Sequence, residues 1–187
     1  MWLLYEQIWL KEGGSKRRTP WHQDLAYIPL EGNDLAVLWI TLDPVAKEDS
    51  LEFVPGSHRG PLFNPTAFDP NDEAASMFPD GIWPPLPNIE RARDQWDIVS
   101  WPTQPGDILV FHPAMLHGGA PTHEGGRRRS ISLRFFGDHA FCAERPESGL
   151  ADIDRLKYDD GSGDPIKELA GAAPGTPFRH PRFLQLR

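Results

Sequence analysis

Short apolar runs separated by glycine and proline dominate the chain, and helical periodicity is scarce. The run over 35–42 is apolar on both faces and partly β-branched, which predicts a buried central strand. Further strands are predicted over 5–11, 50–54, 98–101, 107–111 and 130–136, and an extended segment over 21–27. Because most of these runs end at Pro or Gly, the pattern predicts an all-β barrel or jelly roll with few short helices.

The pattern also divides the chain into parts. Residues 1–144 carry the predicted strands and are expected to form one barrel domain. Within it, 61–95 is rich in Pro, Asp and Asn, and a stretch of this length in a compact domain predicts a lid-like, partly helical insertion. Residues 145–187 predict an irregular C-terminal extension with one short helix near 166–170, just after Pro165.

Composition excludes several classes of protein. The 187 residues carry a formal net charge of −8, which disfavours nucleic acid and anionic membranes as partners. The single cysteine, Cys142, rules out an internal disulfide and a cysteine-rich zinc site. The apolar run at the N-terminus is too short for a signal peptide, and no apolar run in the chain is long enough to span a bilayer. A soluble, cytoplasmic protein is expected.

The candidate chemistry begins with His22 and Asp24. In an extended segment residues i and i+2 point to the same face, so this imidazole and carboxylate can bind one ion. The pair alone is weak, because such pairs arise by chance in a chain of this composition. His117, shortly after the predicted strand 107–111, would complete the two-histidine, one-carboxylate facial triad of non-haem Fe(II) oxygenases. Zinc accepts the same ligands, so spacing alone does not identify the metal.

A second candidate group lies in and just before the predicted strand 130–136. If the odd-numbered apolar positions 131, 133 and 135 face one layer, the even-numbered positions share the opposite face. That face carries Arg128, Ser130, Ser132 and Arg134. Arg127 and Arg129 then point away from the interior. Arg128 is therefore the candidate to bind a dicarboxylate in bidentate fashion, and a solvated basic turn is the alternative.

Four ordered motifs carry a resemblance to a known family: TPWHQDLAY at 19–27, VPGSHR at 54–59, PGDILVFH at 105–112 and LHG at 116–118. Together they resemble the phytanoyl-CoA dioxygenase family, whose members are Fe(II)- and 2-oxoglutarate-dependent oxygenases on a double-stranded β-helix. The resemblance extends from about residue 5 to residue 141. It implies that fold here, but no particular substrate.

The resemblance also implies roles for individual residues. His22, Asp24 and His117 match the family's iron ligands. Arg128 matches the arginine that pairs with the far carboxylate of 2-oxoglutarate, and Trp39 matches an aromatic position beside this cosubstrate, although a core tryptophan is the alternative. Ser132 lies on the favoured face and could hydrogen-bond the cosubstrate, although a barrel serine with its own partner is commoner. His58 and His112 are expected to be structural rather than metal ligands.

The implied activity uses Fe(II), 2-oxoglutarate and O2, hydroxylates a C–H bond of a small organic substrate, and releases succinate and CO2. Aspartate at position 24, where related halogenases have a small residue, favours hydroxylation. Two alternatives stay open at this point. One is a metal-dependent oxygenase that does not use 2-oxoglutarate, and the other is a non-catalytic jelly-roll module that binds a ligand or a partner chain.

One departure from the family concerns the N-terminus. Family members generally carry helices before the first barrel strand, whereas here the predicted strand begins almost at Met1. Those helices would back the large sheet. Two alternatives follow: either the chain is a fragment or the product of a shortened gene model, or a second copy of the chain or another partner covers the exposed sheet face.

Overall fold

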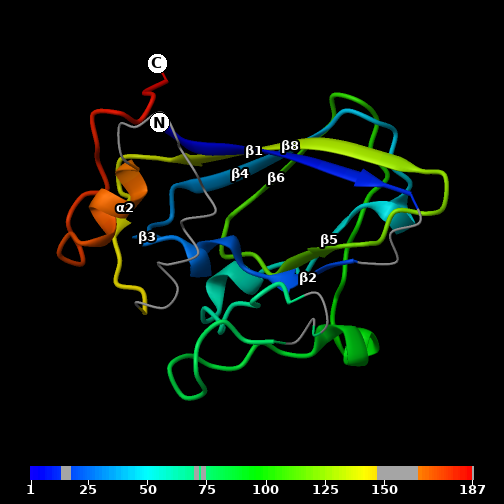
Figure 1. The fold of residues 1–187 in the computed structure, drawn as a ribbon, viewed down its shortest axis with the longest axis horizontal. Helices are drawn as coiled ribbons and strands as arrows, with labels where there is room; N and C mark the ends of the chain where they lie inside the picture. Colours follow the sequence, from blue (N-terminus) through cyan, green and yellow to red (C-terminus); the bar gives the residue numbers. More distant parts are fainter. Residues whose placement is uncertain (14–17, 70–71, 73–74, 147–163, 187) are drawn as a thin grey trace.

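The computed structural model describes residues 1–13, 18–69, 72, 75–146 and 164–186. Two antiparallel sheets face each other, with the loops around their edges (Figure 1). The larger sheet has the order β1-β8-β4-β6. Its strands are β1 (Trp2–Glu12), β8 (Arg127–Phe136), β4 (Leu35–Thr41) and β6 (Ile108–Phe111).

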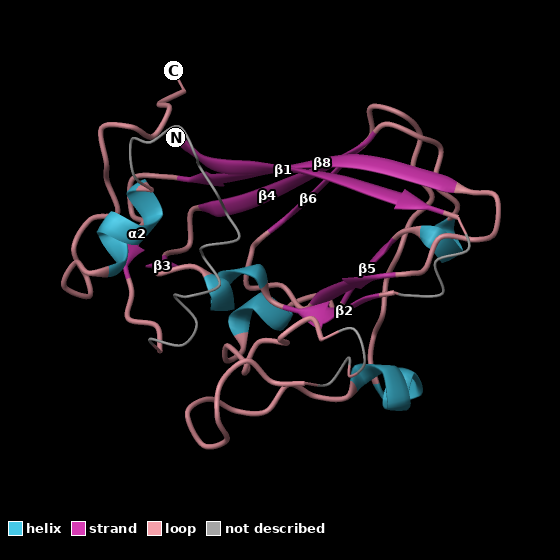
Figure 2. Cartoon of the chain, in the orientation of Figure 1, coloured by secondary structure: helices cyan, strands magenta, loops and turns pink. Residues whose placement is uncertain are grey.

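The smaller sheet has the order β2-β7-β5, formed by β2 (Thr19–His22), β7 (His117–Gly119) and β5 (Leu51–Phe53). A third pair joins β3 (Leu30–Glu31) to β9 (Phe141–Cys142). The described helices are all short (Figure 2). They are η1 (Asp24–Tyr27), η2 (Lys47–Asp49), η3 (Ser57–Arg59), η4 (Ile89–Gln95) and α2 (Pro165–Ala170). The predicted all-β class is confirmed.

Several predicted elements differ in detail. The segment 98–101 forms no strand. Only Val99 pairs, in a bridge with Phe53. The segment is short, because η4 ends just before Trp96 and because Pro102, which has no backbone N–H to donate, follows it. The segment 21–27 is extended only as far as His22, after which η1 takes over at Asp24. The three-residue strand β7 was not predicted, since its two glycines give no apolar alternation.

Strand β4 is central, as predicted, between β8 and β6. Its burial alternates instead of being uniform, with Val37, Trp39 and Thr41 buried and the residues between them half-buried. The predicted alternation of β8 is confirmed too, because its even-numbered residues are buried and Arg127 and Arg129 are exposed. The large sheet therefore has one buried face, directed at the small sheet, and one outer face.

The outer face of the large sheet is apolar and open. Cross-strand register places Ile8 beside Ile131 and Ile108 beside Ile40 on this face. The exposed fraction is 78% for Ile8 and 49% for Ile108, and Val110 and Leu10 are also exposed. The bare sheet face expected from the sequence is therefore present, and the partner that would cover it stays a prediction.

The C-terminal residues pack against one end of the sandwich. Phe136 is fully buried and forms edge contacts with Phe178 and Phe183, at ring-centroid distances of 5.3 and 5.1 Å. Helix α2 follows the prediction of a short helix after Pro165, and the Asp164 side chain caps it by accepting a hydrogen bond from Ile166 N at 2.8 Å. The described part of the C-terminal extension thus contributes to the core.

The described residues of 61–95 are irregular apart from η4, and the assignment of this stretch as a lid-like insertion stays a prediction. Its beginning is fixed by the buried Gln23, whose amide donates to Ala114 O at 2.8 Å and accepts from Phe63 N at 2.9 Å. Among the described residues no helix is long and apolar enough to cross a membrane.

The packing of the C-terminal segment gives a first test. Replacing Phe178 with Ala leaves a cavity beside Phe136, so the free energy of unfolding should fall by about 3–5 kcal/mol in urea titrations. The control is Leu184→Ala in the same segment, where the side chain is 60% exposed and the expected change is below about 0.5 kcal/mol. Equal, small effects of both variants would contradict a packed C-terminal segment.

Candidate metal centre

Three predicted ligands converge between the sheets. His22 ends β2 and lies directly opposite His117, the first residue of β7, while Asp24 begins η1 two residues later. Their ligand atoms all lie within 4.8 Å of one another, and all three side chains are buried. His22 Nε2 is 3.4 Å and His117 Nε2 is 4.0 Å from Asp24 Oδ1. The structure therefore brings the predicted triad together, although Asp24 comes from a helical turn and not from an extended strand.

Backbone carbonyls fix which nitrogen of each histidine faces the centre. His22 Nδ1 lies 2.8 Å from Pro20 O, and His117 Nδ1 lies 2.9 Å from Met115 O. Because a carbonyl oxygen only accepts, each Nδ1 must carry the proton and donate. Each Nε2 then has a free lone pair directed at the other ligands. Metal-binding histidines are typically oriented in this way.

The two oxygens of the Asp24 carboxylate have different partners. Its Oδ2 accepts two hydrogen bonds from Arg134, from Nε at 3.1 Å and from Nη2 at 2.8 Å, and both side chains are buried. Its Oδ1 is the oxygen nearest the two imidazoles. The Arg134 guanidinium also lies over the ring of Tyr5, 4.7 Å from its centroid. This arrangement favours a single-oxygen ligand.

The charges agree with this geometry. Burial alone would raise the pKa of Asp24, but the charge of Arg134, the hydrogen bond of His22 and the charge of His117 hold it well below its usual range. Burial and the neighbouring His22 lower the pKa of His117 to about 3. At neutral pH the centre therefore presents a carboxylate and a neutral His117 imidazole, the forms that bind a metal ion.

These donors fit a divalent transition metal. Neighbouring donors of an octahedral ion lie about 3 Å apart when the bonds are about 2.1 Å long. The separations of 3.4 and 4.0 Å between Asp24 Oδ1 and the two imidazole nitrogens need only small side-chain shifts to reach that spacing. Imidazole and carboxylate together suit Fe(II) as well as Zn(II), so the donor set fits iron without excluding zinc.

The other predicted site residues lie along the same interior. Arg128 is buried on the inner face of β8, and its Nη1 donates to Asp49 O. Trp39 is buried opposite Ser132 on the neighbouring strand, within a cluster that includes Phe53. Ser132 accepts a hydrogen bond from Trp9 Nε1 at 3.2 Å. These three residues lie in the interior as expected, and their contacts with a cosubstrate stay a prediction.

Two other histidines lie apart from the triad. His58 and His112 pack against each other, with ring centroids 5.6 Å apart, and line a separate cavity of about 730 Å³. Among the described residues one group of three potential ligands is present, and it includes neither of them. Their structural role stays a prediction.

Arg134 was missed as a site residue. Its position on the inner face was predicted by the alternation of β8, but only Arg128 was selected as functional. A buried arginine requires an anionic partner, and the only acidic member of the predicted triad is Asp24. That requirement is the signal that could have identified the pair.

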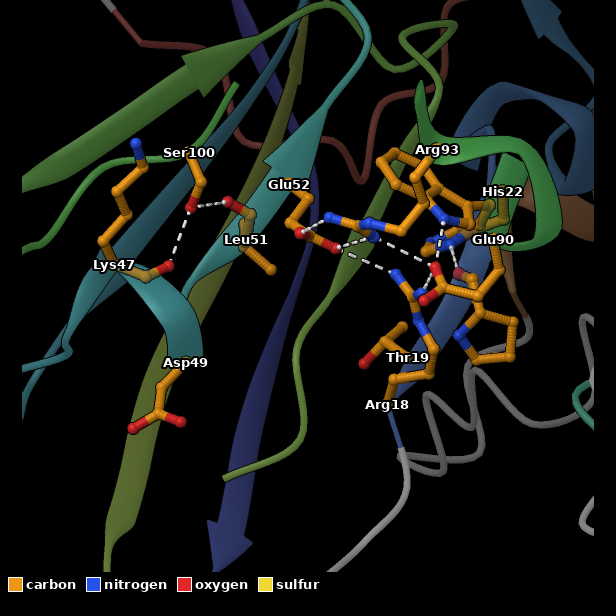
Figure 3. A network of polar contacts seen from close by, with 12 residues as sticks. Arg18, Thr19, His22, Lys47, Asp49, Leu51, Glu52, Glu90, Arg93 and Ser100 are labelled. Atoms are coloured by element: carbon orange, nitrogen blue, oxygen red, sulfur yellow. Dashed lines mark hydrogen bonds and ion pairs between the residues drawn. The ribbon is translucent and has the colours of Figure 1, made fainter. Parts of the chain in front are cut away.

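An ion-pair network ties η4 to the small sheet (Figure 3). Glu52, on β5, bonds Arg18 at 2.9 Å and also pairs with Arg93 of η4. Arg93 in turn pairs with Glu90 at 3.0 Å, and Glu90 also contacts Arg18. Glu52 lies opposite Gly118 on β7, next to the ligand His117. The network thus holds the end of the 61–95 insertion against the strand that carries a metal ligand.

A buried facial triad inside a two-sheet jelly roll defines the class of non-haem metal oxygenases. Residues 3–130 match the family described as phytanoyl-CoA dioxygenase (PhyH). This match covers more than half of the chain, so the protein belongs to the phytanoyl-CoA dioxygenase family, within the Fe/2-oxoglutarate oxygenase superfamily. The resemblance drawn from the four sequence motifs is confirmed.

Curated relatives include the peroxisomal phytanoyl-CoA dioxygenase of Bos taurus, 28% identical over 155 residues, which make up 78% of this chain and 44% of the relative. A probable alpha-ketoglutarate-dependent hypophosphite dioxygenase of Stutzerimonas stutzeri is 28% identical over 123 residues, covering 62% of this chain and 38% of the relative. The chain therefore spans less than half the length of these two relatives.

Solved structures support the fold. The epimerase SnoN, in complex with Fe3+, alpha ketoglutarate and nogalamycin RO, has a TM-score of 0.65 at 23% identity, covering 97% of this chain and 63% of SnoN. EvdO2 from Micromonospora carbonacea var. aurantiaca, complexed with 2-oxoglutarate, has a TM-score of 0.57 at 26% identity, covering 78% and 55% of the two chains. The predicted double-stranded β-helix is confirmed.

The Asp24–Arg134 pair gives the second test. Arg134→Leu removes both donors from Asp24 Oδ2 and leaves a buried carboxylate unpaired, so the free energy of unfolding should fall by about 3–5 kcal/mol. Affinity for Fe(II) or Co(II), measured anaerobically by competition with a chelating dye, should fall about 10- to 100-fold.

The matched control is Arg129→Leu on the same strand. Arg129 lies on the outer face and pairs with Asp43 at the surface. Its loss should cost no more than about 1 kcal/mol and leave metal affinity unchanged. A normal metal affinity in Arg134→Leu would show that Arg134 does not position the ligand.

Proposed function

We propose that this protein is a non-haem Fe(II)- and 2-oxoglutarate-dependent dioxygenase that hydroxylates a C–H bond of a small organic substrate. The observation that carries the proposal is the donor set of His22, Asp24 and His117, each oriented by a further hydrogen bond. Three protein donors leave positions open for a cosubstrate and O2. When bound, the iron supplies the oxidising chemistry, driven by conversion of 2-oxoglutarate to succinate and CO2.

The protein's own residues would position the reactants. Arg128 is proposed to bind the far carboxylate of 2-oxoglutarate, because it is buried and has no carboxylate oxygen within ion-pair distance in the described part of the chain. Trp39 and Ser132, on neighbouring strands of the same face, are proposed to line the cosubstrate site. The dry interior between the sheets would confine the reaction.

Hydroxylation is favoured over other outcomes by two observations. The aspartate at position 24 occupies the ligand position that is vacant in halogenases, and the curated relatives quoted above are named dioxygenases. SnoN, which shares the fold, is named an epimerase. The same metal centre can therefore serve different reactions, and the outcome depends on how the substrate is held.

An aromatic wall beside the metal ligands supports an organic substrate with apolar surface. The Phe68 ring lies 5.2 Å from the His22 ring and 5.8 Å from Tyr27. Phe68 has φ of 52°, the only positive value at a non-glycine position in the described residues, and its side chain is partly exposed. Such strain is typically retained at functional sites.

Turnover provides the third test. Purified protein with Fe(II), 2-oxoglutarate and O2 should release succinate, measured by mass spectrometry, even without the substrate. His22→Ala should abolish this release because it removes a metal ligand, whereas His139→Ala, at an exposed histidine outside the site, should not change it. Arg128→Ala should reduce it about 10- to 100-fold at low 2-oxoglutarate concentration, because a charge-assisted contact is lost.

The alternatives give different results. Full activity in Arg128→Ala, with succinate still formed, would remove Arg128 from the cosubstrate site. Metal binding without any succinate or 2-oxoglutarate consumption would favour a metal-dependent oxygenase that uses another cosubstrate. Equal iron content in wild type and His117→Ala would favour the non-catalytic module.

A further inference from the structure

A second, half-buried cation lies beside Arg128. Lys11 on β1 is the direct cross-strand partner of Arg128 on β8, and both side chains lie on the inner side of the sheet. Lys11 Nζ reaches across to the small sheet and donates to Thr19 Oγ1 at 2.9 Å. The side chain of Lys11 therefore spans the interior at the end of the sandwich where Arg128 is buried.

Neither cation forms an ion pair in the described part of the chain, and the nearby charge of Asp49 compensates Arg128 only in part. Within the described ranges, neither Lys11 nor Arg128 has a carboxylate oxygen within 4.0 Å, and their polar partners are the Thr19 hydroxyl and the Asp49 carbonyl. The Asp49 carboxylate pairs with His123. An ammonium has three donors and a guanidinium five, so most donors of this pair are free for another acceptor.

The charges destabilise each other in this position. Burial, the charge of Arg128 and the charge of Arg18 lower the pKa of Lys11 to about 8. Arg18 itself is compensated by Glu52 and Glu90. Positive charge that is only partly compensated, by Asp49, thus lies between Lys11 and Arg128, and an anion bound there would stabilise it.

The small sheet approaches Arg128 closely at a glycine. Gly119 on β7 lies opposite Thr19. A methyl group added at Gly119 would meet Leu51 Cδ2 at 3.3 Å and both Arg128 Nη2 and Thr19 Oγ1 at 3.4 Å. A side chain at this position would therefore crowd the Arg128 guanidinium and the Thr19 hydroxyl, which glycine allows to lie next to the small sheet.

We propose that Lys11 is a second cationic residue of the 2-oxoglutarate site, so that the far carboxylate of the cosubstrate is held between β1 and β8 against Thr19 and Gly119. This inference rests on the proposed function. A carboxylate has two oxygens with about four acceptor positions, enough for both cations and the Thr19 hydroxyl. Lys11 would then set the preference of this enzyme for a dicarboxylate over a monocarboxylate 2-oxo acid.

The alternative role for Lys11 is structural. Strand β1 is an edge of the large sheet, and lysine commonly protects edge strands from pairing with other chains. A purely protective lysine would affect solubility and not the binding of 2-oxo acids. Binding measurements therefore separate the two roles.

The experiment is an anaerobic titration of the Fe(II)-loaded full chain with 2-oxoglutarate or pyruvate, followed by the visible charge-transfer band of the bound 2-oxo acid. Lys11→Met should raise the Kd for 2-oxoglutarate about 10- to 100-fold and leave the Kd for pyruvate, which lacks the far carboxylate, unchanged. Lys47→Met, at an exposed lysine of η2, is the matched control and should behave as wild type.

Three further variants keep the proposal falsifiable if Lys11→Met folds poorly. Lys11→Gln retains a donor for Thr19 without the charge and should weaken 2-oxoglutarate selectively, whereas Lys11→Arg should restore most of the affinity. Gly119→Ala should also weaken the binding of 2-oxoglutarate more than that of pyruvate, because the methyl group would crowd Arg128 Nη2 and Thr19 Oγ1.

The outcomes distinguish the two proposals. Wild-type affinity for 2-oxoglutarate in both Lys11→Met and Lys11→Gln would overturn the role of Lys11 while leaving the proposed function intact. An equal loss of affinity for both 2-oxo acids would also overturn it, since the effect would not concern the far carboxylate. The lack of any band in iron-loaded wild type would overturn the proposed function itself.

Discussion

The buried contact between Arg134 and Asp24 is the interaction on which the functional site depends. It joins the large sheet, through β8, to the turn that follows β2, and so it fixes the metal centre relative to both sheets. The cost of burying two charges is offset only because they meet with two hydrogen bonds. Arg134 thereby holds one carboxylate oxygen and leaves the other for the histidines.

The other polar side chains of the interior lie on the same strand, β8. Because β8 alternates strictly, the side chains between Arg134 and Arg128 line one continuous polar path inside an otherwise apolar sandwich. The metal ligands lie near its Arg134 end, and the two cations without an ion-pair partner in the described part of the chain, Lys11 and Arg128, lie at its other end. A short molecule with a metal-binding group at one end and a carboxylate at the other matches this distribution of charge.

Much of this could be predicted from the sequence, for reasons that differ by element. The alternation in 130–136 was sufficient to place Arg128 inside and Arg129 outside, since period-two patterning leaves no other choice. The triad was predicted from residue types and motifs, although the geometric reason given for it was incomplete, because Asp24 begins a 3-10 turn.

The elements that were missed depend on contacts between distant segments. The pairing of Asp24 with Arg134 joins residues 110 positions apart, and the packing of Phe178 against Phe136 draws the C-terminal segment into the core. No local pattern reports such contacts. The segment 98–101 shows the converse, since its apolar residues suggested a strand but found only one bridging partner.

The central claim is that this centre binds Fe(II) together with 2-oxoglutarate. The most direct measurement is to add Fe(II) and then 2-oxoglutarate to the purified chain without oxygen and to record the visible spectrum. The account predicts a charge-transfer band that requires both additions and is lost in His22→Ala. A folded, iron-loaded protein that shows no band at saturating 2-oxoglutarate would contradict it.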